Sequence, residues 1–186
     1  MKRILFGFGA LLASATLALA ADPAAPSIGK LLDQEIRMAE SEVVSLAEAM
    51  PADKYDFAPT QGEFKGTRTF SQQMTHIAAV NYMVASAALA EPNPSVAGDG
   101  ENGPPSIKGK DAVVKYLKDS FALAHKAPAG LTAANAMDMV PSAFGSGKTP
   151  RISMVSAVPW HTFDHYGQSV VYARMNGIIP PASRPQ

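Results

Sequence analysis

The sequence predicts an all-α protein, an up-down four-helix bundle with long connecting loops. Four long segments repeat their apolar residues at helical spacing, and no set of alternating apolar segments indicates a sheet. Proline- and glycine-rich stretches separate these four segments. The chain has 186 residues, of which 47% are hydrophobic and 17% charged, so one domain can bury a sizeable core.

The first predicted helix lies between Ser27 and Pro51. Ser27 can accept a hydrogen bond from the first turn, and Pro51 ends the helix because a proline ring cannot continue one. The apolar stripe of this helix consists of Ile28, Leu31, Leu32, Ile36, Ala39, Val43, Leu46 and Met50.

The second predicted helix begins after Thr69 and runs to Pro92. Thr69, followed three residues later by Gln72, is a capping box. His76 lies in the first half of this helix and shares a largely apolar face.

The third predicted helix covers residues 111–127 and is stopped by Pro128. His125 lies in its last turn, where a cation suits the helix dipole, and we expect it on the surface. The preceding connection, residues 93–105, holds six glycines and prolines among small polar residues. Loops of this length are usually functional or mobile, so we expect a lid or flexible rim there.

Residues 129–151 are ambiguous. "LTAANAMDMV" could form a short helix, whereas "SAFGSGKTPRISM" is typical of a turn between extended segments. The fourth predicted helix contains "VPWHTFDHYGQSVVYARMNG" and ends at Gly177, which suits a left-handed C-cap. Ile178 is then placed for the hydrophobic contact of a Schellman ending.

Residues 1–20 have the pattern of a secretory signal peptide. Lys2 and Arg3 precede an apolar stretch over residues 4–19, and Ala18, Leu19 and Ala20 form a small-x-small cleavage site. We therefore expect an exported protein, periplasmic or extracellular, whose single domain covers residues 21–186 and has no stable membrane insertion. An uncleaved membrane anchor is the alternative.

The composition excludes several kinds of site. There is no cysteine, which excludes disulfides, a thiolate nucleophile and cysteine-based metal sites. The 16 basic and 16 acidic side chains balance, and no basic run could follow a phosphate backbone. We therefore expect no nucleic acid partner.

Two of the four histidines, His161 and His165, are four residues apart in the fourth helix. Side chains at this spacing project from one helix face about 6 Å apart at Cβ, so two ring nitrogens can converge on one ion. A third imidazole, from His76, would leave a fourth position open for water. The alternative is that these are ordinary buried histidines with hydrogen-bonded neighbours.

Three further residues lie close to the histidine pair. Gln168 and Tyr172 continue its stripe, and they could hydrogen-bond a bound water or substrate or simply line the core. Asp164 points about 100° away, so it either orients an imidazole or is a solvated charge. The order His-x-x-Asp-His resembles the inverted zincin order His-x-x-Glu-His, whereas the HExxH order is absent because Thr162 takes its glutamate position.

Two longer strings resemble the DinB superfamily of DinB/YfiT-like proteins. They are "PADKYDFAPTQGEFKGTRTFSQQMTHIAAVNYM" and "HTFDHYGQSVVYARMNGIIPPASR", which with the spacing between them cover most of the chain after the signal segment. The resemblance implies a four-helix bundle with a divalent metal ion on three histidines, whose roles fall on His76, His161 and His165. Members of the family include thiol-dependent transferases and isomerases that use small cytoplasmic thiols.

The leading hypothesis is a metal-dependent enzyme, a transferase or a hydrolase. Three imidazoles favour zinc or nickel, and the substrate would be a small molecule, for which a thiol is one candidate. A non-catalytic bundle that binds a metal or ligand, and a structural bundle without metal, are the alternatives. A homodimer is one possible assembly.

Overall fold

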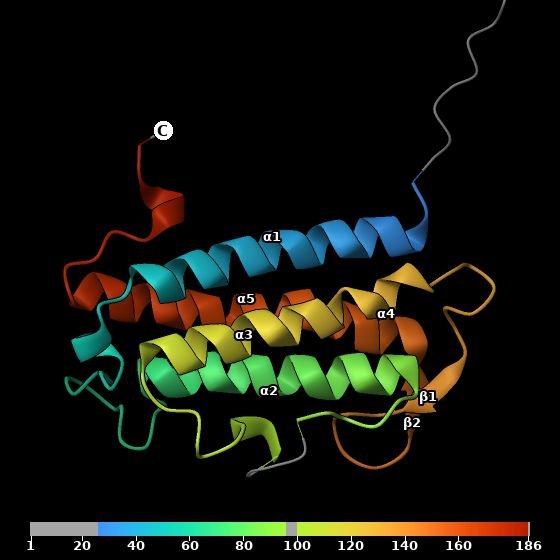
Figure 1. The fold of residues 1–186 in the computed structure, drawn as a ribbon, viewed down its shortest axis with the longest axis horizontal. Helices are drawn as coiled ribbons and strands as arrows, with labels where there is room; N and C mark the ends of the chain where they lie inside the picture. Colours follow the sequence, from blue (N-terminus) through green and yellow to red (C-terminus); the bar gives the residue numbers. More distant parts are fainter. Residues whose placement is uncertain (1–25, 96–99, 186) are drawn as a thin grey trace, which may run out of the picture.

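The computed structural model describes residues 26–95 and 100–185. The fold is a four-helix bundle with a short hairpin, as Figure 1 shows. The four long helices are α1 (Ile28–Ala49), α2 (Phe70–Leu89), α3 (Lys110–Ala124) and α5 (Arg151–Met175). The shorter elements are η1 (Ala52–Lys54), η2 (Gly100–Asn102), α4 (Lys126–Ala129), β1 (Met139–Pro141), β2 (Lys148–Pro150) and η3 (Pro181–Ser183).

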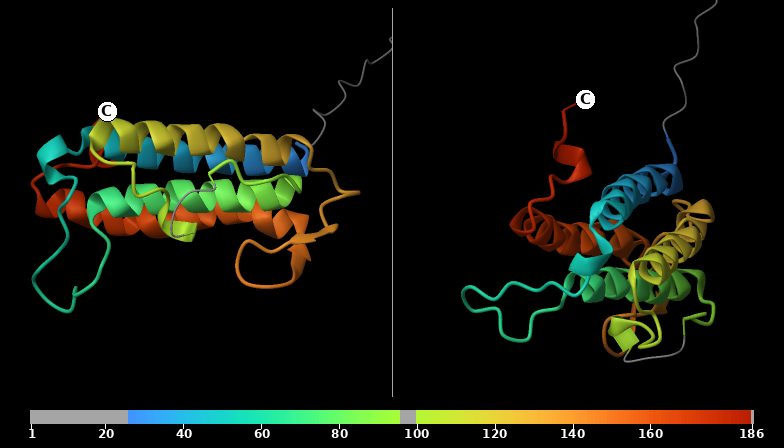
Figure 2. Two further views of the ribbon diagram at one scale, coloured as in Figure 1. Left: turned by 60° about the horizontal axis from the view of Figure 1, so that its bottom comes forward. Right: turned by 60° about the vertical axis from the view of Figure 1, so that its left-hand side comes forward.

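The predicted all-α bundle is confirmed, but the helices do not simply alternate in direction along the chain. In Figures 1 and 2, α1 and α5 run one way and α2 and α3 run the other way. α2 and α3 are parallel because the chain returns between them to the end of the bundle where α2 begins. The 3₁₀ turn η2, on this return, contacts α2.

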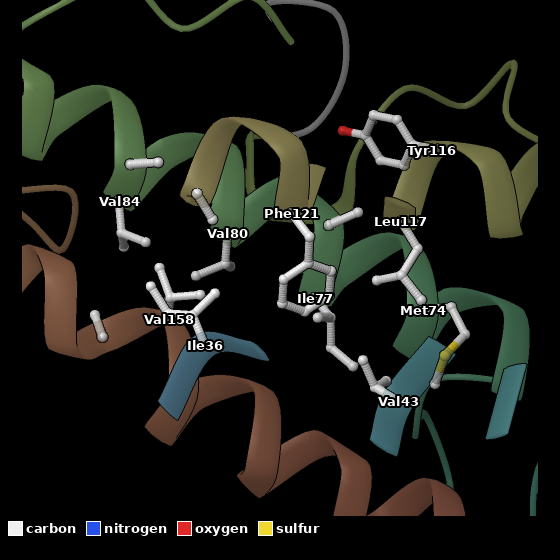
Figure 3. Packing of buried hydrophobic residues seen from close by; sticks show 14 of the residues in the cluster. Ile36, Val43, Met74, Ile77, Val80, Val84, Tyr116, Leu117, Phe121 and Val158 are labelled. Carbon is white, nitrogen blue, oxygen red and sulfur yellow. The ribbon is translucent and has the colours of Figure 1, made fainter. Parts of the chain in front are cut away.

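The core lies between the four long helices. Figure 3 shows apolar side chains from all four meeting in the middle, with Ile36 of α1, Ile77 of α2 and Phe121 of α3 fully buried. Burying a side chain of this size stabilises the fold by about 1.5–3 kcal/mol. Leu31, which the predicted stripe of α1 included, is 46% exposed instead. Apart from Leu31, the buried apolar residues of the four long helices form one packed core that stabilises the bundle.

The predicted helix starts are confirmed. The Ser27 hydroxyl accepts a hydrogen bond from the Lys30 N–H at 3.3 Å. At the start of α2, the Thr69 hydroxyl accepts from the Gln72 N–H at 3.2 Å, and the Gln72 side chain accepts from the Thr69 N–H at 2.8 Å. This reciprocal capping box fixes the first turn of the helix that carries His76.

The end of α5 is a Schellman motif, as predicted. The Ile178 N–H donates to the Ala173 carbonyl at 2.9 Å, and the Gly177 N–H donates to the Arg174 carbonyl at 3.0 Å. Gly177 has a φ of 75°, a conformation that glycine adopts without the steric penalty of a Cβ atom.

The third helix ends earlier than predicted. α3 stops at Ala124, and the chain turns at His125 into the short α4, which includes Pro128. Proline is tolerated there because it lies in the first turn, where its missing N–H would have no helical partner. A Cβ atom at Gly29 of α1 would lie 2.2 Å from the Pro128 carbonyl oxygen, so the close packing of α4 on α1 requires glycine.

Residues 129–151 form turns and a hairpin. β1 and β2 pair antiparallel, which confirms the extended segments. "LTAANAMDMV" is not a helix, because the Asn135 side chain accepts from the Thr132 N–H at 2.8 Å and donates to the Gly130 carbonyl at 2.9 Å, which favours a turn. α5 already begins at Arg151, inside the segment that we expected to be extended. The Arg151 N–H donates to the Asp138 carbonyl at 2.8 Å.

The predicted signal peptide, residues 1–20, lies outside the described residues. Within the part that the structure describes, no helix combines the length and the apolar character that crossing a bilayer requires.

Candidate metal centre

Three of the four histidines meet between α2 and α5. The two helices run antiparallel, so His76 of α2 lies opposite His161 and His165 of α5. The ring centroids are 4.5–4.9 Å apart, and one nitrogen from each ring lies within 4.8 Å of the other two. The three residues are only 4%, 7% and 9% exposed, respectively. The structure therefore brings the three predicted residues together in a nearly closed site.

The outer nitrogens of two rings are held by hydrogen-bond acceptors. His76 Nδ1 lies 2.7 Å from the Glu101 carbonyl oxygen, and His165 Nδ1 lies 2.8 Å from Gln73 Oε1. A carbonyl or amide oxygen can only accept, so each Nδ1 carries the proton. The Nε2 atom of both neutral rings then holds a free lone pair.

Two of the inner nitrogens are spaced as ligands of one metal ion require. His76 Nε2 and His161 Nε2 are 3.2 Å apart. Two nitrogens bound to one zinc ion at about 2.1 Å in tetrahedral geometry would lie about 3.4 Å apart. A hydrogen bond from His161 to His76 is the metal-free alternative, but it leaves the lone pair of His165 Nε2 unused. The donor set therefore fits one ion better than it fits hydrogen bonds alone.

Burial keeps the three rings neutral. Together with the neighbouring imidazoles, it lowers the pKa of His161 to about 3 and that of His165 to about 4. Burial also lowers the pKa of His76, although the hydrogen bond to the Glu101 carbonyl acts in the opposite direction. A neutral imidazole is the form that binds metals, so the cluster is ready to bind one at neutral pH.

A polar chain leads from the cluster to a cleft. Gln73 accepts from His165 and donates through its own Nε2 to Gln168 Oε1 at 3.0 Å. Both glutamines line a cleft of about 920 Å³, together with Arg68 and Asn102. The histidines themselves do not line the cleft, so the glutamine pair separates it from the cluster. Small-molecule sites commonly have about this volume.

The long connection before α3 supplies one wall of the site. The Arg68 guanidinium donates to Glu101 Oε1 and to Asn102 Oδ1, both at 3.0 Å. The main chain of Glu101 at the same time accepts from His76. The described part of the predicted lid is thus tied to α2 at η2. The mobility expected for residues 93–105 stays a prediction.

The residues beside the histidine pair have different surroundings. Asp164 is 65% exposed at its side chain, and its Oδ2 lies 3.8 Å from His165 Nε2. Since Gln73 holds Nδ1 of that ring, Asp164 is mainly a solvated charge rather than the group that orients the imidazole. Tyr172 belongs to the buried core, and its hydroxyl donates to the Arg68 carbonyl at 3.1 Å.

His125 lies outside the cluster, but it is not the simple surface residue that we expected. Its Nδ1 is 2.6 Å from Asp33 Oδ1 and its Nε2 is 3.0 Å from Glu40 Oε2, and its side chain is 20% exposed. The two carboxylates are two helical turns apart on α1, which packs antiparallel to α3. The ring therefore ties the end of α3 to α1.

Comparison with known families agrees with this architecture. Residues 35–169, which include the three clustered histidines, match the family model of the DinB superfamily. The chain belongs to the DinB superfamily. The resemblance seen in the sequence is thereby confirmed.

Several solved structures have a similar fold. A DinB-like protein of Bacillus cereus is 13% identical with a TM-score of 0.64, over 83% of this chain and 96% of that one. A conserved protein of Enterococcus faecalis is 14% identical with a TM-score of 0.63, over 81% and 98% of the two chains. A DinB-like protein of Bacillus subtilis is 16% identical with a TM-score of 0.58, over 84% and 99%. At these identities the likeness concerns the fold, and no curated protein matches the chain.

Sequence reasoning missed two groups that shape the site, the Gln73 amide and the Glu101 carbonyl. Gln73 stands three residues before His76, so the two side chains share a helix face, and this spacing was the available signal. A main-chain carbonyl on a loop gives no signal in the sequence.

Proposed function

We propose that this DinB-like protein is a metal-dependent enzyme in which His76, His161 and His165 bind one divalent ion through Nε2. The observation that carries the proposal is the pair of outer hydrogen bonds at Nδ1 of His76 and His165. They leave two Nε2 lone pairs pointing into one small volume, where lone pairs repel each other unless an ion binds both. Hydrogen bonds of this kind are typical of histidines that bind metals.

The ligand set favours zinc or nickel. Three neutral imidazoles suit these ions, and a magnesium or calcium ion would require oxygen ligands. Three protein ligands leave a coordination position for a small molecule. A divalent ion bound there would supply Lewis acidity, which lowers the pKa of a bound water or thiol.

The cleft beside the glutamine pair is where we propose that the substrate binds. Gln73 and Gln168 present amide groups to it, and Arg68 supplies a cation. A small polar molecule, for which a thiol is one candidate, would be recognised by such groups. The reaction would be a group transfer or a hydrolysis. The pattern of residues 1–20 supports export to the periplasm or beyond, where this chemistry would take place.

Metal analysis and activity assays test the proposal in sequence. Protein purified without an affinity tag should contain close to one zinc or nickel ion per chain, and the loaded protein should turn over substrates from a panel of thiol-transfer and ester-hydrolysis reactions. Stoichiometric metal without any turnover would favour the alternative of a non-catalytic metal-binding bundle. Protein that neither contains nor takes up a divalent ion would contradict both functions.

A further inference from the structure

The outer end of the glutamine pair presents a hydrogen-bond donor to the cleft. Gln168 Oε1 accepts from Gln73 Nε2 at 3.0 Å, so the Nε2 group of Gln168 is left for a further contact. Gln168 is exposed and lines the cleft, and its Nε2 meets no acceptor among the described residues. A ligand that binds to this amide must therefore supply an oxygen acceptor.

Two cations lie along the same cleft, Arg68 and Lys108. Arg68 donates through Nε and Nη2 to Asn102 and Glu101, and its Nη1 has no acceptor in the part of the chain that the structure describes. Glu101 offsets part of this charge, whereas Lys108 is exposed and forms no ion pair with a described residue. Asp56 is the one acid among the described residues that line the cleft. The lining therefore favours an anionic group over a cationic one.

The start of α2 borders the cleft but does not supply the donors for an anion. The N–H groups of residues 70–73 all donate to oxygens of the chain, at 2.7–3.2 Å. Phosphate and sulfate are commonly bound by free N–H groups at such helix starts. An anion bound here depends on side chains instead. A guanidinium and an amide suit the two oxygens of a planar carboxylate.

We propose that the cleft binds the carboxylate of a small-molecule substrate, with one oxygen on Gln168 Nε2, the other on Arg68 Nη1, and Lys108 nearby as a second cation. The Tyr172 hydroxyl, one helical turn after Gln168, donates to the Arg68 carbonyl at 3.1 Å, which holds Arg68 against the part of α5 that carries Gln168. This inference rests on the proposed function, because it assigns the substrate class for the same site.

The bound carboxylate would lie at the end of a hydrogen-bond chain that reaches the histidine cluster. Gln168 accepts from Gln73, and Gln73 Oε1 accepts from His165 Nδ1 at 2.8 Å. Hydrogen bonds in a chain polarise one another, so an anion on Gln168 makes each amide oxygen a stronger acceptor. A stronger acceptor at Nδ1 makes the Nε2 lone pair of His165 more basic. The carboxylate therefore strengthens a proposed metal ligand without touching it.

Nuclear magnetic resonance of the metal-free protein tests the carboxylate site and the hydrogen-bond chain without an ion. Succinate is the probe, and its neutral analogue succinamide is the control. Succinate should shift the side-chain amide resonances of Gln168 and Gln73 and the Nδ1 resonance of His165, all with one dissociation constant of about 1 mM, a modest affinity for so few atoms. Succinamide should leave these resonances unchanged.

Replacements at exposed positions separate the contacts from the fold. Gln168→Leu and Lys108→Met should each raise the succinate dissociation constant by about fivefold or more, because each removes a group that binds the anion. Gln168→Leu should also abolish the shift at His165. Gln34→Leu, at an exposed position of α1, is the matched control and should bind succinate as wild type does.

Zinc titration then measures the coupling. Succinate should raise the zinc affinity of wild type by about two- to fivefold and leave that of Gln168→Leu unchanged. An equal rise in Gln168→Leu would mean that succinate binds the ion directly, and it would overturn the hydrogen-bond chain.

Three results would overturn the carboxylate site. The first is a set of amide resonances that stay unchanged in about 20 mM succinate, well above the expected dissociation constant. The second is succinamide or sulfate that binds as tightly as succinate, and the third is succinate binding that Gln168→Leu and Lys108→Met do not weaken. Protein that binds succinate as expected but takes up no divalent ion would support the site and contradict the metal-dependent function, so the two failures are distinguishable.

Discussion

The two histidine sites of the molecule differ in what faces the ring nitrogens. His125 has a carboxylate oxygen within 3.0 Å of each ring nitrogen, so the ring bridges Asp33 and Glu40. The clustered rings between α2 and α5 have neutral oxygen acceptors on two outer nitrogens and one another's nitrogens on the inside. Identical side chains therefore suit a bridge between two carboxylates in one place and a metal ion in the other.

The difference arises from the helices that carry the rings. The face of α1 opposite His125 carries Asp33 and Glu40, two helical turns apart. This face is partly open to solvent. The α2–α5 interface is closed, and the groups nearest to its rings are amides and a main-chain carbonyl. The comparison teaches that the charge and burial of the neighbours, more than the histidine spacing alone, decide which role an imidazole can take.

The largest expected effect separates the two sites by metal affinity. Replacing His76, His161 or His165 with alanine leaves two ligands, so zinc affinity should fall by more than about 100-fold, the upper range for a supporting residue. His125→Ala should bind zinc as tightly as wild type. Calorimetric titration measures both, and a His125→Ala protein that lost the metal would break the comparison.

The next effect concerns the amide that supports His165. Gln73→Leu removes the acceptor at Nδ1, and zinc affinity should fall about 10- to 100-fold. Gln73→Glu keeps an acceptor and should retain the affinity. Gln34→Leu, at an exposed position of α1, is the control for a glutamine replacement elsewhere. Equal affinities in all three variants would show that the outer hydrogen bond has no part in binding.

His125 should matter for stability and not for metal. His125→Ala removes two hydrogen bonds to charged groups and leaves Asp33 and Glu40 facing an empty space, so the free energy of unfolding should fall by about 1.5–3 kcal/mol. Urea denaturation of metal-free protein at pH 7 measures the change. A loss below about 0.5 kcal/mol would mean that the bridge contributes no more than an ordinary surface contact.

The same bridge should depend on acid. Burial would raise the pKa of Asp33, but hydrogen bonds and charges from His125 and Arg37 outweigh it and hold that pKa below its usual value of 3.8. A carboxyl with a depressed pKa stabilises the fold fully above its unfolded pKa, and this contribution is lost as the pH falls through the folded pKa. Asp33→Asn should therefore destabilise the protein at pH 7, and the loss should shrink progressively as the pH falls below 3.8. A loss that stays the same or grows as the pH falls would contradict this sign.

The smallest expected effect is at Asp164. Its carboxylate is mostly solvated, and exposed charge interactions are worth about 0–1 kcal/mol. Asp164→Asn should therefore change zinc affinity by no more than about fivefold. A larger loss in calorimetric titration would make Asp164 part of the ligand shell.

The sequence predicted most of the site because the necessary signals are local. Helical spacing places His161 and His165 on one face, and the capping box at Thr69 fixes the helix that carries His76. The contacts of Glu101 and His125 could not be predicted, since they depend on how α2, α3 and α1 pack and on the parallel run of α2 and α3. The early end of α3 was missed because we took Pro128 as the residue that stops this helix. Pro128 instead lies in the first turn of α4, where proline is tolerated.

A crystal structure of untagged protein with zinc added tests the central claim most directly. The account predicts one ion bound by Nε2 of His76, His161 and His165, at about 2.0–2.1 Å from each. His165 Nδ1 should remain on Gln73, and the ion should have at least one further ligand that is not a protein side chain. An ion bound instead between His125, Asp33 and Glu40, or a zinc-soaked crystal in which the three-histidine cluster binds no ion, would contradict it.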